Sequence, residues 1–538
     1  MKIAISGFKG MIPGIHPRAL PEDHGVIAES VRLDDGTLTP IRGERRVFTF
    51  DSTMRSFIKH PSGDWMGFST VVKAANGAVD ATRVYVTGSG EPKVFTSSTE
   101  SMNLRLPPPS IRPRARINSG VVDQDIATES VYVYTFVTDL GEESAPSRLS
   151  NRIKWSPGVQ IEVYGLPAAN PNPERGLIAM RLYRSITDAL GATTLYFLDE
   201  IGFGASYIDD TEESSDVTGE PIPSTDYDMP PTNMQGITSM PNGMMVAFRG
   251  KEILFCEPYI HHAWPVKYRL KVDYPIVGLG SFGSSVVILT EGMPYVAQGT
   301  HPEAMVMEKI EMDLPCVAAR GIVDMGYAVV YPSTDGLVQV GNSGAQMISG
   351  ALFKREFWAS MRPETFIGSK ANGRYVFSYL PQAAREEDET KMVRRLGMID
   401  MSGTQPFFMT DDAQFTHMEN DLKTGHLFGL FDGVGVVRWD DLTQPYKRMR
   451  WRSKEIHIPT PTNFGAIRVD GDDDPNADLY CRVFCGKGHR LVRETRGRNK
   501  VERLPSGFTE EVWQIEIEGF MPVTAVFMAH APSELAKG

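Results

Sequence analysis

Three residues near the C-terminus belong to types that bind zinc. Cys481 and Cys485 are followed by His489, and cysteine and histidine at short spacing are the usual ligands of structural zinc sites. Residues 479–485 nevertheless read as a β-strand, in which positions i and i+4 lie roughly 13 Å apart. Two thiolates at that separation cannot both bind one ion at about 2.3 Å. We therefore expect half-buried thiols here and no metal site.

Other polar groups could also do chemistry, but their surroundings favour structural roles. His261 and His262 could bind a metal or titrate near neutral pH, yet no carboxylate or third ligand lies close in sequence, so loop packing is expected. The acidic clusters at 411–412 and 471–474 lack a calcium loop's pattern of ordered oxygens and a turn glycine, and are expected to be solvated. Residues 333–336, Ser-Thr-Asp-Gly, resemble the turn motif of sialidase-type propellers only in part, and Asp-Gly alone accounts for a hairpin turn.

The familiar catalytic motifs do not occur in the sequence. It contains no Gly-x-Ser-x-Gly elbow, phosphate-binding loop or His-Glu-x-x-His helix. Carboxylate pairs suitable for glycoside hydrolysis could still be assembled in space. We predict no enzyme activity, no catalytic residues, no metal and no cofactor.

Positive charge is concentrated in two groups near the C-terminus. The members of the first are Arg448, Arg450, Arg452 and Lys454, and those of the second are Lys487, Arg490, Arg493, Arg496, Arg498, Lys500 and Arg503. These residues could dock an acidic partner, contact DNA phosphates without sequence specificity, or form solvated hairpins. No interleaved aromatic residues accompany them, so a nucleic-acid stacking platform is not indicated.

The composition limits the class of protein. The 538 residues include 55 Lys and Arg and 67 Asp and Glu, a net charge of −12, which argues against binding nucleic acid through the whole surface. Hydrophobic residues make up 41%, enough for a sizeable core. The four cysteines cannot form a disulfide scaffold, and Cys256 and Cys316 stand in apolar segments typical of a core. Without a signal peptide or an apolar run of 18 residues, no membrane span is expected.

Turn residues divide the chain into an all-β series of units. Residues 1–47 read as an extended arm that contributes little core, and 48–105 as the first propeller strands. Four prolines within 106–117 predict a linker that cannot run inside a sheet. A second proline-rich stretch at 220–232 ends an inserted β-sandwich that spans 106–226.

A repeat follows the insertion, over residues 227–443. Its strand pairs, marked by the second or third residue of each leading strand, recur at spacings of 42, 42, 47 and 52 residues. Such periods, with several short strands each, are typical of β-propeller blades. The strands before residue 105 could supply a sixth blade, and the alternative is a set of unrelated hairpins in a large sandwich. The markers are Met244, Val286, Ala328, Tyr375 and Leu427.

Residues 444–538 predict a separate antiparallel β-domain. In it Trp513, Ile515 and Ile517 alternate with polar residues, as in a strand whose one face is buried. Helical periodicity is confined to short stretches around 354–361 and 385–392.

Three stretches together resemble virion proteins of tailed bacteriophages, namely the tail hub or nozzle proteins of the head-to-tail connector. The opening 12–44, with its proline-rich arm and the ending Gly-Thr-Leu-Thr-Pro, is similar to the start of such proteins. Segments 132–147, 180–185 and 206–211 are similar to their fibronectin-like decorations, and 503–535 resembles their closing strand pair.

The resemblance implies a β-propeller with an inserted immunoglobulin- or fibronectin-like sandwich. It implies self-association as a ring, expected to be a hexamer, with portal or adaptor proteins and tail fibres or spikes as partners. Genomic DNA would pass through the lumen without sequence-specific binding, and an acidic wall suits that passage because attraction to phosphates would slow ejection. The location implied is the virion tail, after assembly in the host cytoplasm. The alternative function is a β-propeller that binds or cleaves carbohydrate.

Overall fold

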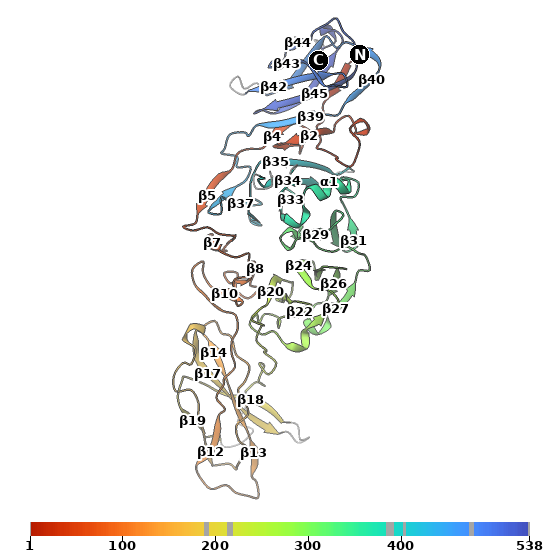
Figure 1. The fold of residues 1–538 in the computed structure, drawn as a ribbon. Helices are drawn as coiled ribbons and strands as arrows, with labels where there is room; N and C mark the ends of the chain where they lie inside the picture. The colour runs from red at the N-terminus through yellow and green to blue at the C-terminus, as the bar shows by residue number, and fades with distance from the viewer. Residues whose placement is uncertain are drawn as a thin grey trace.

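The computed structural model describes residues 2–187, 193–211, 219–383, 392–401, 405–472 and 478–535. Within these ranges the protein is all-β, as predicted, and has one α-helix, α1 (Arg355–Ser360), where the sequence predicts one. The second predicted helix, around 385–392, falls almost wholly outside the described residues. The molecule is elongated, with the C-terminal strands at one end and the inserted strands at the other (Figure 1). No helix in the described ranges has the length and apolar character needed to cross a membrane.

Five consecutive four-stranded arrays form the middle of the molecule, and each of the five predicted strand pairs supplies the second and third strands of one of them. The sequence did not predict the first and fourth strands of each array, and most of these are shorter or more polar than the inner two. The strands are β20 (Gln235–Ser239), β21 (Met245–Arg249), β22 (Glu252–Phe255), β23 (Leu270–Lys271), β24 (Ile276–Phe282), β25 (Ser285–Thr290), β26 (Tyr295–Gln298), β27 (Val306–Lys309), β28 (Val323–Asp324), β29 (Ala328–Pro332), β30 (Leu337–Gly341), β31 (Gly344–Met347), β32 (Ile367–Ala371), β33 (Arg374–Tyr379), β34 (Arg395–Asp400), β35 (Phe407–Asp411), β36 (His417–Asn420), β37 (Leu427–Phe431) and β38 (Gly435–Arg438).

The fourth strand of the last array comes from the N-terminal arm. β5 (Arg45–Thr49) pairs antiparallel with β38, so that Thr49 lies opposite Gly435. The strands that precede residue 105 form two further sheets where the sequence predicted one unit. The first is β6 (Ser56–Lys59) with β7 (Trp65–Phe68), and the second is β8 (Lys73–Asn76), β9 (Val84–Thr87), β10 (Lys93–Phe95) and β11 (Ser101–Asn103).

The first strands of these arrays pack against one another in succession. β8 contacts β20, and the contacts continue through β24, β28, β32 and β36 to β6. The sheet of β6 and β7 shares a hydrophobic cluster with β8 and β9 through Ile58, Met66 and Val84. Apolar side chains on both faces of the second strands, such as β25, in which every residue is buried, fill the space between arrays.

The inserted strands occupy residues 114–209 and have a core of their own. Tyr132, Trp155 and Met180 are among its fully buried side chains. The predicted linker 106–117 is partly a strand, because its prolines end at Pro113 and residues 114–117 then pair as an edge strand of their sheet. The strands are β12 (Arg114–Ser119), β13 (Thr128–Ser130), β14 (Tyr132–Thr138), β15 (Ile153–Trp155), β16 (Gln160–Tyr164), β17 (Leu177–Thr187), β18 (Thr193–Ile201) and β19 (Ser206–Asp209).

The N-terminal arm does not lie passively on other units, as the sequence suggested. Phe8, Val31 and Leu38 are buried in the largest core of the molecule, which also takes in the C-terminal strands. Among its strands, β1 pairs with β46, and β2 pairs antiparallel with β39 and parallel with β35. The strands are β1 (Lys2–Ile5), β2 (Gly25–Glu29), β3 (Val31–Arg32), β4 (Thr39–Pro40), β39 (Met449–Ser453), β40 (Ile456–Thr462), β41 (Ala466–Gly471), β42 (Leu479–Cys485), β43 (Arg490–Thr495), β44 (Val501–Arg503), β45 (Glu510–Gly519) and β46 (Val523–Ala529).

The C-terminal strands do not stand apart as the separate β-domain that the sequence predicted, because they share sheets with other parts of the chain. Because β2 joins β35 to β39, one sheet runs from β32–β35 through β2 to β39, β45, β42 and β43. The alternation in β45 is confirmed, since Trp513, Ile515 and Ile517 are fully buried. Glu516 on the opposite face is buried as well, which the sequence did not predict.

Candidate functional site

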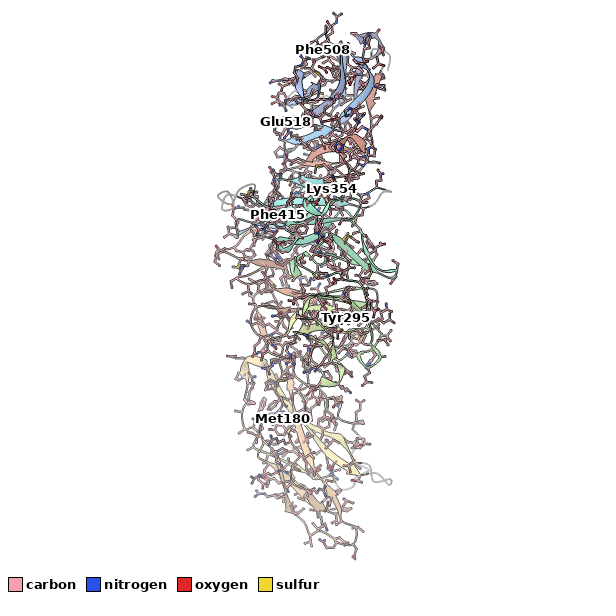
Figure 2. All side chains as sticks on the ribbon, turned by 45° about the vertical axis from the view of Figure 1, so that its right-hand side comes forward. Met180, Tyr295, Lys354, Phe415, Phe508 and Glu518 are labelled. Atoms are coloured by element: carbon pink, nitrogen blue, oxygen red, sulfur yellow. The ribbon has the colours of Figure 1, made fainter. Side chains whose placement is uncertain are left out.

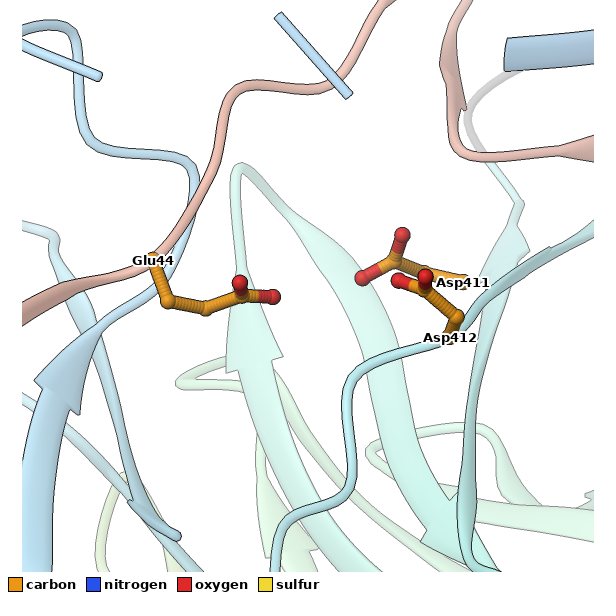
Figure 3. Close-up of side chains that lie close together, drawn as sticks. All are labelled: Glu44, Asp411 and Asp412. Atoms are coloured by element: carbon orange, nitrogen blue, oxygen red, sulfur yellow. The ribbon is translucent and has the colours of Figure 1, made fainter. Parts of the chain in front are cut away.

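A lysine occupies the one group of three carboxylates that the described residues bring close enough to hold a cation. Glu44, Asp411 and Asp412 offer oxygens within 4.8 Å of one another (Figure 3). Lys447 Nζ lies 3.0 Å from Glu44 Oε1 and 3.0 Å from Asp411 Oδ1, and it also pairs with Asp412. The ammonium group thus takes the place of a metal ion and ties the N-terminal arm to the end of β35.

Electrostatics within this cluster explain how a buried acid is tolerated. The prediction of a solvated 411–412 pair is wrong for Asp411, whose side chain is fully buried, and correct for Asp412. Asp411 also accepts hydrogen bonds from Ser30 Oγ at 2.8 Å and Trp439 Nε1 at 3.1 Å. Burial lowers the pKa of Lys447, but the neighbouring carboxylates outweigh this effect and raise that pKa above its usual value.

The three arginines of the first C-terminal basic group are neutralised on the face of their own sheet, whereas Lys454 donates to the Leu20 carbonyl. Glu516 Oε2 lies 2.9 Å from Arg450 Nη2 and 2.6 Å from Arg452 Nη2, while Glu516 Oε1 lies 2.9 Å from Arg482. Arg448 pairs with Glu518 at 2.6 Å. Burial raises the pKa of Glu516, but the hydrogen bonds from Arg450 and Arg482 and the charge of Arg452 hold it below its usual range. Cross-strand pairing of β39, β45 and β42 builds this ladder, so these arginines hold the sheet together.

The second basic group remains at the surface of the C-terminal end. It flanks β43 and β44, which are the edge strands of their two sheets. Arg490 lies over the Phe508 ring at 4.7 Å, Arg496 lies over Tyr480 at 4.5 Å, and Arg498 is half-buried. Figure 2 shows Phe508 near the tip of this end. The exposed members are Lys487, Arg490, Arg493, Arg496, Lys500 and Arg503.

The cysteines behave as core residues. Cys481 and Cys485 lie on β42 as predicted, and both are buried rather than half-buried. Burial raises the pKa of the Cys481 thiol to about 12, and the same holds for Cys256 and Cys316. His489 lies outside the strand, and its Nε2 is 3.4 Å from Glu455 Oε1 at the surface.

His262 connects the insertion to the middle arrays, while the adjacent His261 bonds within its own array. His262 Nε2 donates to the Glu143 carbonyl at 2.7 Å, and its Nδ1 is 3.7 Å from Glu142 Oε1. His261 Nε2 donates to the Gly243 carbonyl at 3.1 Å, and burial lowers the pKa of His261 to about 4. Loop packing is confirmed, and the carboxylate that the local sequence lacks comes from the insertion, where Glu142 also pairs with the buried Arg175.

The remaining predicted motifs are turns or fall outside the description. Ser333 N donates to Gly336 O at 2.8 Å and closes the β29–β30 hairpin. Asp432 and Gly433 both have positive φ, as the tight β37–β38 turn requires. Of the acidic cluster 471–474, residues 473 and 474 lie outside the described ranges.

Sequence reasoning missed the Lys447 cluster and the link between His262 and the insertion because their members are far apart along the chain. No local spacing signals either group. A cavity of about 370 Å³ between the β6–β7 sheet and the next sheet was also missed. Its lining mixes rings of Phe50, Trp65, Phe68 and Phe95 with polar groups such as Glu91.

Comparisons with known proteins leave the chain without an assigned family. No family model matches it, and no curated protein matches it. Among solved structures, one similar chain comes from the S. cerevisiae Dbp5 complex with Nup159, Gle1, IP6 and ADP, at 8% identity and a TM-score of 0.25, covering 53% of this chain and 76% of that one. The extracellular domain of BT4673 from B. thetaiotaomicron is 11% identical with a TM-score of 0.27, and the match covers 91% of this chain and 70% of that one. The N-terminal domain of Nup159 is 6% identical with a TM-score of 0.24, and the match covers 77% of this chain and 99% of that one.

Proposed function

We propose that this protein is a structural component of a bacteriophage tail, a hub or nozzle subunit that assembles as a ring. In this proposal the seven arrays from β6 to β38 are blades of a β-propeller, and β5 completes the last blade. The succession of contacts from β8 to β36 and on to β6 supports this arrangement. The insertion then projects between the second and third blades.

The observation that carries the proposal is the placement of two different surfaces at opposite ends of an elongated molecule. The exposed basic edge of β43 and β44 lies at one end, and the insertion lies at the other (Figure 1). A subunit of a ring needs one surface for the component above and another for the component below or for fibres. The remaining surface is acidic on balance and repels DNA, which suits a wall of the ejection channel. Portal or adaptor proteins and fibres are the proposed partners, in the virion tail.

Electron microscopy of the assembled protein and of purified particles tests this function. The assembled protein should form a ring with a lumen wide enough for double-stranded DNA. In purified particles this ring should be located in the tail. A variant with Lys487, Arg490 and Arg493 changed to Glu should form rings that no longer join the neighbouring component. The matched control is Arg152→Glu in the insertion, whose side chain is 82% exposed. A monomer that is absent from particles would contradict the proposal.

The second candidate, carbohydrate binding, is favoured by the cavity beside β7. Aromatic faces such as Trp65 and Phe68, next to Glu91 and Lys93, provide apolar and hydrogen-bonding surfaces of the kind that small-molecule sites combine. A glycan array with wild-type protein and Trp65→Ala decides this alternative. Binding that depends on Trp65 supports it, and no binding to any glycan counts against it.

A further inference from the structure

The array of β6 and β7 has fewer strands than the others. In the described part of the chain six arrays have four strands each, counting β8–β11 and the array that β5 completes, whereas β6 and β7 form a sheet of two. In each of the six, the third strand pairs antiparallel with the second. The edge of β7 that faces away from β6 is therefore the edge at which the other arrays have their third strand.

The backbone groups along this edge of β7 are unused. The His60 N–H donates to the Asp64 carbonyl at 2.8 Å, which fixes the residues of β7 that face β6. Because alternate residues of an antiparallel strand face the partner strand, Trp65 and Gly67 turn their N–H and C=O groups away from β6. Among the described residues, no hydrogen bond reaches these groups. Such an edge is a template for another strand.

The cavity beside β7 lies along the same edge. All four residues of β7 line it, together with Phe50 and, from β10, Lys93 and Phe95. Its volume of about 370 Å³ is typical of ligand sites. In Figure 1, β7 lies between β5 and β10. The place of a third strand is thus hollow.

The walls of this cavity are apolar on both faces that an added strand would present. The Phe95 ring lies 6.0 Å from the Phe68 ring, centre to centre, and a Cβ atom at Gly67 would meet the Phe50 ring. Gly67 and Phe68 point to opposite faces of the sheet because they are successive residues of a strand. An added strand would therefore set one side chain against Phe95 and the next against Phe50.

Two charged side chains line the cavity, and they differ in their partners. Asn103 Nδ2 donates to Glu91 Oε2, and Arg105 Nη1 lies 3.5 Å from Glu91 Oε1. Lys93 is exposed, and in the described ranges its ammonium group has no carboxylate partner. Lys93 and Phe95 share a face of β10, so the unneutralised charge lies beside the apolar wall. A ligand that carries a carboxylate complements it.

We propose that the free edge of β7 binds an extended segment of another protein chain, which adds an antiparallel third strand to the β6–β7 sheet. The backbone groups of Trp65 and Gly67 hold the segment, and the cavity walls select its side chains. The segment has apolar residues for Phe95 and Phe50, and a carboxylate for Lys93. A glycan has no matching series of N–H and C=O groups, so it leaves the free edge unexplained. This binding does not depend on the proposed ring.

Calorimetric titration of the full-length protein with a synthetic peptide tests the site. The probe is the peptide Thr-Thr-Glu-Leu-Phe-Thr-Thr, acetylated and amidated at its ends. Two derivatives carry N-methyl groups, one at Glu and Phe and the other at Leu and the following Thr. One derivative should bind about tenfold more weakly or worse, because it loses the N–H groups that face β7, and the other should bind like the parent peptide.

Reversing one charge tests the role of Lys93. Lys93→Glu should weaken binding of the parent peptide about threefold, as expected for an exposed ion pair, and a peptide with Lys in place of Glu should restore it. Lys154→Glu, at an exposed strand residue of the insertion, is the matched control and should bind the parent peptide as the wild type does. Unchanged melting temperatures check that both variants fold.

Three results would overturn the proposal. The first is that the parent peptide does not bind. The second is that both methylated derivatives bind equally well, because recognition would then use side chains alone. The third is a glycan that binds in a Trp65-dependent manner while the peptide does not displace it, which would assign the cavity to carbohydrate.

Discussion

Replacing Lys447 by Met should detach the N-terminal arm from the end of β35. The change removes the ammonium group shared by Glu44, Asp411 and Asp412 and keeps much of the apolar stem. Asp411 then remains buried with only neutral donors, Ser30 and Trp439. Breaking a buried ion pair from one side costs about 3–5 kcal/mol, and the lower end applies because Asp412 is 66% exposed and can turn to solvent.

Hydrogen exchange of the arm, together with thermal unfolding, measures this effect. The amides of β5 and of the neighbouring residues should exchange faster in Lys447→Met by a factor that corresponds to about 3 kcal/mol. Lys487→Met, at an exposed lysine of the C-terminal end, is the matched control and should leave the exchange unchanged. Equal protection of the arm in both variants would refute the reasoning.

Varying the pH and adding calcium provide two further tests of the same cluster. The pKa of Lys447 is raised above its unfolded value of 10.5, so its contribution is complete below pH 10.5 and is lost as pH rises through the folded pKa. The difference between wild type and Lys447→Met should therefore shrink in alkaline buffer. Millimolar calcium should partly restore the arm in the variant, whose three carboxylates face one another, and should leave the wild type unaffected.

Three further outcomes are expected. Asp209→Ala leaves Arg184 buried without its partner at 2.9 Å, so the insertion should lose about 3–5 kcal/mol, measured by its unfolding transition and by limited proteolysis. Glu516→Gln should lower the stability of the C-terminal sheet by about 2–4 kcal/mol, because three arginines then surround a neutral amide. Added salt screens the repulsion among these arginines, so the stability difference between wild type and variant should become smaller. Burial lowers the pKa values of His261 and His417 to about 4 and about 3, from an ordinary value of 6.5. The unfolded chain thus binds more protons below pH 6.5, so melting temperatures should fall from pH 6.5 toward pH 3, and His261→Gln should reduce that slope.

The strands that the sequence predicts are those whose neighbours are close along the chain. Hairpins such as β29–β30 have apolar strands joined by turn residues, so a short stretch of sequence is enough to predict them. First strands such as β20 and β36 are short and carry polar residues, which leaves no clear alternation. They were missed for that reason.

The arm and the Lys447 cluster show a different limit of sequence reasoning. Phe8 and Leu38 are buried by strands from the C-terminal region, and nothing beside them in the sequence indicates those partners. In the same way, Glu44 gives no sign that it will meet Lys447. The basic groups could be located from the sequence, but only the cross-strand register shows that Glu516 neutralises Arg450 and Arg452 while the β43–β44 edge stays exposed.

The pairing of β5 with β38 and of β1 with β46 determines when this protein can fold. Ribosomes release β1 and β5 long before β46 and β38, the strands with which they pair. Until those partners have been synthesised, the arm has unpaired strand edges and exposed apolar residues such as Phe8, so chaperones or other chains can bind it. Completion of the last middle array therefore waits until β38 has been synthesised, and nascent chains that stall before residue 435 should remain open and sensitive to proteases.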